Sequence, residues 1–151
     1  MGRIILPVNY LVFDSGYRGP CNKEDTDQQA FIAWIRYHCP WVNVFHVPNE
    51  LNGSKVQGEI MRRKGKVGGV SDNIILTPGH DKPFAAMELK RRDKTKGKWQ
   101  PGQREFLNKT ADDGGFASVS YGLDCIKNSA KLYLCGSESD AIFSSYLAQN
   151  K

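Results

Sequence analysis

Two short apolar runs joined by a turn constrain the fold of this chain more than any other feature. Residues 72–77 read DNIILT and residues 84–90 read FAAMELK, with the loop PGHDKP between them. Runs of this length, bounded by proline and glycine, predict a β-hairpin whose loop is longer than two residues. A chain of 151 residues suits one core, so we expect a single domain over residues 1–151.

Helical periodicity and strand alternation predict the other elements. In chain order they are a helix over 25–39 capped by Asp25 or Asp27, a strand over 41–47, a short helix near 55–64, a helix over 99–115, a strand over 116–121, a helix over 123–134, and a C-terminal helix over 137–149 that opens with a Ser-x-x-Asp cap. Residues 1–22 fit either an extra strand or a packed arm. The sequence therefore predicts an α/β fold, a small mixed sheet flanked by helices.

The second strand of the hairpin carries an acid and a base on one face. Alternate side chains of a strand share a face, so Glu88 and Lys90 point the same way and Met87 and Leu89 point the other way. Asp72 begins the preceding strand, and hairpin pairing brings it beside them. Two neighbouring carboxylates repel each other unless a cation is bound, and Mg²⁺ prefers such ligands. The alternative is a structural ion pair between Glu88 and Lys90.

Two glutamines are expected to point inward from the starts of helices. Gln103 lies three and four residues before Phe106 and Leu107, and Gln28 is spaced in the same way from its own apolar partners. A buried amide needs hydrogen-bond partners. Each glutamine is therefore either a satisfied core amide or a polar group aimed at the site.

The net charge of +5 invites a polyanionic partner, and the positions of the charges matter more than their sum. Basic side chains cluster on both sides of the candidate acids. We expect them to bind backbone phosphates rather than to form solvated loops. The first cluster is Arg62, Arg63, Lys64 and Lys66, and the second is Arg91, Arg92, Lys94, Lys96 and Lys98.

Cysteine and hydropathy patterns favour an intracellular protein. The four cysteines form no CxxC pair, and the three histidines do not complete a zinc spacing. Reduced thiols are therefore expected. No apolar run approaches the length of a membrane span, and the N-terminus does not have the pattern of a signal peptide. We expect no membrane partner and a location in the cytoplasm, or in the host cytoplasm if a phage encodes the chain.

Five short motifs in this order resemble the VRR-NUC nucleases of the PD-(D/E)xK superfamily. They are HVPNE, GGVSDNIIL, AAMELK, QPGQREFL and GGFASVSYGLDCIKNSAKLYL. The resemblance covers roughly residues 24–134 and leaves 1–22 and 137–149 as extensions. It implies a restriction-endonuclease-like core and hydrolysis of DNA phosphodiesters with Mg²⁺ or Mn²⁺. Stand-alone members, common in phages, resemble Holliday-junction resolvases and act as homodimers.

The resemblance also implies roles for individual residues. Asp72 matches the PD aspartate, and Glu88 with Lys90 matches the ExK pair, with the backbone carbonyl of Leu89 as a further metal ligand. Gln103 matches the glutamine that opens the next helix. The remaining matches are supporting residues of less defined role, namely Gln28 (with Glu24 if a carboxylate is needed there), Asn49 and Glu50. One departure is Ser71, which stands where the family has proline and which still permits the extended backbone.

These observations favour a metal-dependent endonuclease for branched DNA such as a Holliday junction or a flap. Two alternatives stay open. One is a non-catalytic DNA-binding or assembly protein on a nuclease fold, because a fold does not guarantee an activity. The other is a nuclease that nicks duplex DNA or acts on RNA.

Overall fold

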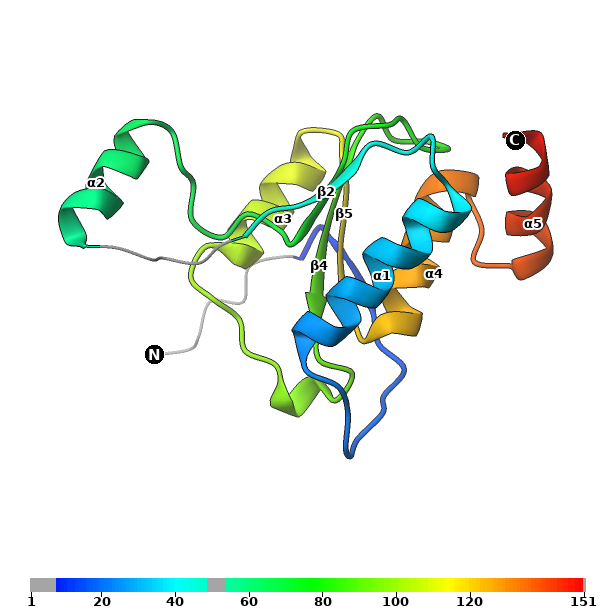
Figure 1. Ribbon diagram of the computed structural model, residues 1–151, viewed down its shortest axis with the longest axis horizontal. Coiled ribbons are helices and arrows are strands. Elements are labelled where there is room, and N and C mark those ends of the chain that lie inside the picture. The colour runs from blue at the N-terminus through cyan, green and yellow to red at the C-terminus, as the bar shows by residue number, and fades with distance from the viewer. Residues whose placement is uncertain (1–7, 49–53, 151) are drawn as a thin grey trace.

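A five-stranded sheet lies at the centre of the computed structural model, which describes residues 8–48 and 54–150 (Figure 1). The strands are β1 (Leu11–Phe13), β2 (Val44–His46), β3 (Asn73–Ile75), β4 (Ala85–Lys90) and β5 (Phe116–Tyr121), arranged in the order β1-β5-β4-β3-β2. The pairs β1–β5 and β5–β4 are parallel, whereas β4–β3 and β3–β2 are antiparallel. The predicted hairpin is therefore confirmed, as β3 and β4 of a mixed sheet.

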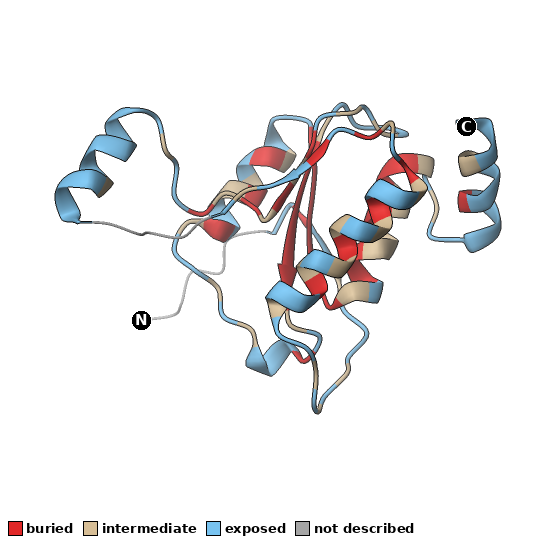
Figure 2. Ribbon diagram, viewed as in Figure 1, coloured by how far each residue is buried: buried red, intermediate tan, exposed pale blue. Residues whose placement is uncertain are grey.

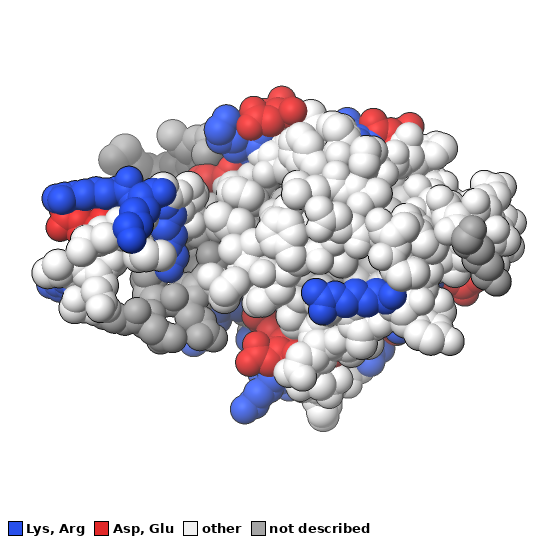
Figure 3. Space-filling view, turned by 45° about the horizontal axis from the view of Figure 1, so that its top comes forward, with Lys and Arg blue, Asp and Glu red and all other residues white. Residues whose placement is uncertain are grey.

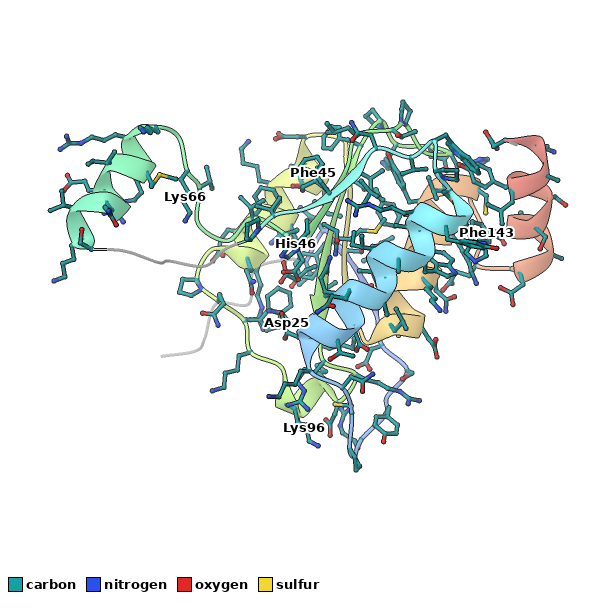
Figure 4. The ribbon with its side chains drawn as sticks, viewed as in Figure 1. Asp25, Phe45, His46, Lys66, Lys96 and Phe143 are labelled. Carbon is teal, nitrogen blue, oxygen red and sulfur yellow. The ribbon has the colours of Figure 1, made fainter. Side chains whose placement is uncertain are left out.

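Helices cover both faces of this sheet. The first face carries α1 (Glu24–His38) and α4 (Leu123–Cys135), and α5 (Asp140–Gln149) packs outside them through Phe143. The ring of Phe143 lies 5.6 Å from that of Trp34 in α1 (Figure 4). The second face carries α3 (Gln103–Asp112), and α2 (Lys55–Arg63) stands apart from the body (Figure 1). A short 3-10 turn, η1 (Lys94–Lys96), follows β4.

Alternation along β4 divides the core into two layers. Met87 and Leu89 join the larger apolar cluster with α1 and α4, whereas Ala86 joins the smaller cluster with α3. Every residue of β4 and β5 is buried (Figure 2). Glu88 and Lys90 share the face of Ala86, as alternation predicted, so both charges lie beneath α3.

The helix starts differ from the predicted caps. Helix α1 begins one residue earlier than predicted, with Lys23 at the N-cap and no side-chain cap. Asp25 lies inside the first turn, and Asp27 is buried and accepts a hydrogen bond from the Asn22 amide instead. In α5 the N-cap is Ser139, two residues after the predicted serine. Ser, Asp and Asn side chains have several local backbone and side-chain partners, so spacing alone does not select the cap.

The N-terminal region contains both of the structures that the sequence left open. Strand β1 pairs with β5, and the loop after it is held against the segment that follows β4. Lys96 Nζ donates to the carbonyl of Gly19, and the Arg91 guanidinium donates to the carbonyls of Cys21 and Asn22. Two of the predicted DNA-binding side chains therefore also hold this loop.

Two further expectations can be compared with the described residues. All four cysteines are free thiols, as expected. Within residues 8–48 and 54–150, no helix is long and apolar enough to cross a membrane.

Candidate active site

The hairpin places Asp72 opposite Glu88. Asn73 pairs with Met87, so the residue before β3 faces the residue after Met87. The backbone N–H of Leu89 donates to Asp72 Oδ2 over 2.9 Å, which fixes one carboxylate oxygen. The predicted proximity of Asp72 to Glu88 on β4 is therefore found, with Ser71 as the residue before Asp72.

Glu88 is the most constrained acid of the site. Its side chain is 1% exposed, and Oε1 accepts a hydrogen bond of 2.9 Å from Gln103 Nε2. Oε2 is buried, and no donor group of the described residues bonds it. Burial, then the negative charge of Asp72 and a hydrogen bond with its side chain, raise the pKa of Glu88 to about 9, and Lys90 opposes this effect. At neutral pH Glu88 therefore keeps its proton, and a bound cation would favour its ionised form.

Lys90 and Gln103 form a network beneath α3. Lys90 is 2% exposed, and its ammonium donates to Gln103 Oε1 (2.8 Å) and to the carbonyl of Lys98 (2.6 Å). The same ammonium lies 3.5 Å from Glu88 Oε1. Gln103 Oε1 also accepts from the backbone N–H of Gln100. Gln103 therefore holds both the acid and the base of β4, which is the inward position that its spacing predicted.

The two candidates on α1 have different surroundings. Gln28 exchanges two hydrogen bonds with the Asn73 amide, of 2.7 and 2.8 Å. Glu24 makes no such pair, and both Lys90 and Asp72 act on it electrostatically. Burial, partly offset by Lys90, raises the pKa of the Glu24 carboxyl. Glu24 is therefore the third acid near the site, whereas Gln28 supports the strand that carries Asp72.

Asn73 and Trp99 contribute to the site but were not identified from the sequence. Asn73 is fully buried, and its alternation with Ile75 on the face toward α1 was the available signal. The Lys90 ammonium lies 5.1 Å from the centre of the Trp99 ring. The sequence predicted a helix that begins at Trp99, but α3 begins at Gln103 and Trp99 lies in an irregular segment after η1, so helical periodicity did not identify it.

The start of β3 is anchored through the backbone of Asp72. Its carbonyl accepts from the N–H of Val47 and lies 2.8 Å from His46 Nδ1 (Figure 4). His46 therefore supports the position of Asp72 through the main chain. The predicted supporting residues Asn49 and Glu50 lie outside the described residues.

The donor set fits a hard divalent cation. An unpaired buried oxygen of Glu88 lies beside Asp72, whose second oxygen, Oδ1, is not used by Leu89. Among residues 8–48 and 54–150, no group of three or more His, Cys, Asp or Glu side chains is arranged to hold a metal ion. A Mg²⁺ site does not require one, because this ion takes one or two carboxylates and completes its shell with water and phosphate oxygens.

Backbone packing couples the segment before Asp72 to the start of α3. Gly69 (φ +82°) lies against Gly102 (φ +86°), which is the N-cap of α3. A Cβ on Gly69 would lie 2.3 Å from the carbonyl carbon of Gly102 and 2.6 Å from the nitrogen of Gln103. Only glycine fits there, so the contact sets where Gln103 begins.

We therefore expect Gly69→Ala to lower any activity of this site by about tenfold or more, because a shift near 1 Å in a catalytic group has effects of this size or larger. Gly68→Ala is the matched control, since nothing lies within 4 Å of its added Cβ. Initial rates and thermal unfolding are measured for both variants. Equal rates for Gly69→Ala and the wild type would show that this contact does not set Gln103.

Lys and Arg side chains gather over α2 at one end of the molecule (Figure 3). Of the basic side chains that follow β4, Arg92 and Lys94 lie over aromatic rings, and Arg91 and Lys96 donate hydrogen bonds to the N-terminal loop. The Arg92 guanidinium lies 3.9 Å from the centre of the Tyr17 ring, and Lys94 Nζ lies 5.7 Å from that of Tyr121. Arg91, Arg92, Lys94 and Lys96 therefore form an ordered basic surface, and the binding of phosphates by this surface stays a prediction.

Comparison with known proteins bears on the fold. No protein-family model and no curated protein matches the chain. A solved structure described as a VRR_NUC domain protein is similar, with a TM-score of 0.60 and 20% sequence identity. The match covers 76% of this chain and 89% of that chain. The expected restriction-endonuclease-like architecture is confirmed, and the chain has the fold of a VRR-NUC domain protein.

Proposed function

We propose that this protein is a metal-dependent nuclease that hydrolyses DNA phosphodiester bonds with Mg²⁺ or Mn²⁺. The observation that carries this proposal is the buried Glu88 carboxylate, which has one unpaired oxygen beside Asp72 and a buried lysine two residues further along the same strand. Perturbed, desolvated acids next to a specific charge partner are typical of catalytic sites. The fold shared with a VRR_NUC domain protein supports the same conclusion.

The residues of the site have different roles in this proposal. Asp72, Glu88 and the carbonyl of Leu89 would hold the metal, which when bound activates water and neutralises phosphate charge. Lys90 brings positive charge to the scissile phosphate, and Gln103 fixes its direction. Glu24 adds negative charge on the α1 side. Gln28 and Asn73 keep the start of β3 in place.

The substrate in this proposal is branched DNA, such as a Holliday junction or flap, and the active species is a homodimer. Support for DNA as the substrate comes from the ordered basic surface after β4 and from the exposed basic residues of α2. Contacts to phosphates provide affinity without reading sequence. Structure specificity must therefore come from shape.

Labelled substrates decide between this function and its alternatives. Four-way junction, flap, duplex, single-stranded DNA and RNA are incubated with the protein and Mg²⁺, Mn²⁺ or a chelator. We expect cleavage of the branched DNA with either metal and none with the chelator. Binding of DNA without cleavage of any substrate would refute the nuclease and favour a binding protein.

The basic surface after β4 gives a prediction about salt. Lys94→Gln combined with Lys98→Gln is expected to weaken binding of all DNA substrates alike. It should flatten the slope of log affinity against log salt by up to about 2, because each phosphate contact releases about 0.9 counterion. The charge-matched control is Lys82→Gln with Lys109→Gln. Anisotropy in Ca²⁺ measures both variants, and equal slopes for the two would remove this surface from the DNA interface.

A further inference from the structure

Helix α2 does not pack against the rest of the described structure. It has nine residues, and none of them is buried. An isolated helix of this length is marginal in water, and helices in proteins gain most of their stability by packing an apolar face. The nine residues span about 13 Å and stand clear of the sheet and its helices (Figure 1).

The two sides of α2 differ in chemistry. At 100° per residue, Val56, Ile60 and Met61 fall on one side of the helix. Their exposed fractions are 67%, 44% and 45%. Lys55 and Arg62 fall on the opposite side. Arg63 falls beside Val56, at the edge of the apolar side, and forms an ion pair of 3.0 Å with Glu59. Helix α2 therefore presents an exposed apolar side bordered by Arg63, and a basic side formed by Lys55 and Arg62.

The segment that follows α2 leads to the candidate active site. The chain runs from Lys64 to Asp72 in eight residues, and midway Gly69 packs against Gly102 at the start of α3. Lys66 lies on this connection (Figure 4). A DNA strand that is bound at Glu88 and Lys90 and continues toward this connection would meet α2.

We propose that α2 is a branch-reading arm, whose apolar face packs on the exposed face of a base pair at a DNA branch point while its basic face contacts the phosphates of the adjoining duplex. This inference rests on the proposed nuclease function and assigns its structure specificity to named residues. Base pairs inside a continuous duplex are covered on both faces, whereas a branch point exposes them. Apolar side chains pack against such exposed bases in many DNA-bending proteins.

Charge favours DNA over a second copy of the chain as the partner of this face. Lys55, Arg62, Arg63 and Lys64 lie within ten residues that contain a single acid, Glu59, in a chain of net charge +5. Two such arms would repel each other on close approach. The phosphates beside a branch point have the complementary charge, and their neutralisation releases counterions.

The test compares two arm variants on two substrates. Val56, Ile60 and Met61 are all replaced by glutamine, which keeps helix propensity and net charge. The control replaces Lys55 and Arg62 by glutamine on the other face. Anisotropy in Ca²⁺, which avoids cleavage, gives affinities for a four-way junction and for a plain duplex of the same length.

The apolar-face variant is expected to bind the junction about tenfold more weakly or worse, because apolar side chains that the bases covered are lost, with duplex affinity unchanged. The control variant should lose affinity for both substrates and flatten the salt slope by up to about 2. Unchanged preference for the junction in the apolar-face variant, or an equal loss on both substrates, overturns the inference.

Sedimentation of both variants without DNA completes the test. We expect the same mass for the wild type and the apolar-face variant. A fall in mass would identify the face as a contact between copies and overturn the inference. These outcomes are separate from failure of the nuclease proposal, which would appear as a wild type that cleaves nothing. A wild type that cleaves DNA but binds junction and duplex equally would overturn only the role of the arm.

Discussion

Replacing Glu88 by glutamine, or Asp72 by asparagine, is expected to abolish phosphodiester cleavage while DNA binding in Ca²⁺ persists. Each change keeps the shape of the side chain and removes one negative charge from the cation site. Loss of such a charge from a preorganised site costs about 10²- to 10³-fold in rate or more. Binding persists because its free energy comes from lysines and arginines.

Cleavage rates and anisotropy on the same junction measure this prediction. Glu105→Gln is the matched control, since Glu105 is an exposed acid on α3, two residues from Gln103. It should cleave at the wild-type rate. Cleavage by Glu88→Gln at the rate of this control would mean that the site has been assigned to the wrong acid.

Lys90→Met is expected to stop turnover but to keep metal binding. Methionine preserves most of the buried volume and removes the ammonium that Gln103 and the carbonyl of Lys98 hold. An ammonium does not ligate Mg²⁺, so its role in this site lies with phosphate or water. Removing one partner of a buried charged pair also lowers stability, by roughly 3 to 5 kcal/mol.

Calorimetric titration of Mn²⁺ and cleavage assays separate these effects. Lys82→Met is the control for the same chemical change at an exposed position. The wild type and the control should cleave and bind Mn²⁺ alike, and Lys90→Met should only bind it. If Lys90→Met is folded by circular dichroism yet binds no Mn²⁺, then Lys90 organises the acids rather than the substrate.

Alternation and spacing were sufficient to predict the centre of the site. The period of two along β4 placed Glu88 and Lys90 on one face, and the hairpin then placed Asp72 beside them. The inward position of Gln103 followed from its spacing to Leu107, which is fully buried. These residues were predictable because each signal is local or crosses a single turn.

The parts that could not be predicted depend on contacts between distant segments. Alternation along β3 indicated only that Asn73 faces α1, whereas its place in the site depends on hydrogen bonds with Gln28, 45 residues away. Strand β1 has three residues and exposed side chains, so its pattern alone did not distinguish a strand from an arm. The packing of Gly69 on Gly102 has no local signature either, because the sequence shows two glycines but not their approach.

The position of β5 between β1 and β4 has a consequence for how the chain folds during synthesis. Strand β1 leaves the ribosome early, yet its only neighbour in the described sheet is β5, and nearby Asn9 bonds Asn108 across 99 residues. Such non-local pairing slows folding, because a long loop must close before the contact forms. Until β5 has been synthesised, the backbone N–H and C=O groups of Leu11–Phe13 have no strand to pair with, so we expect β1 to join the sheet late in folding.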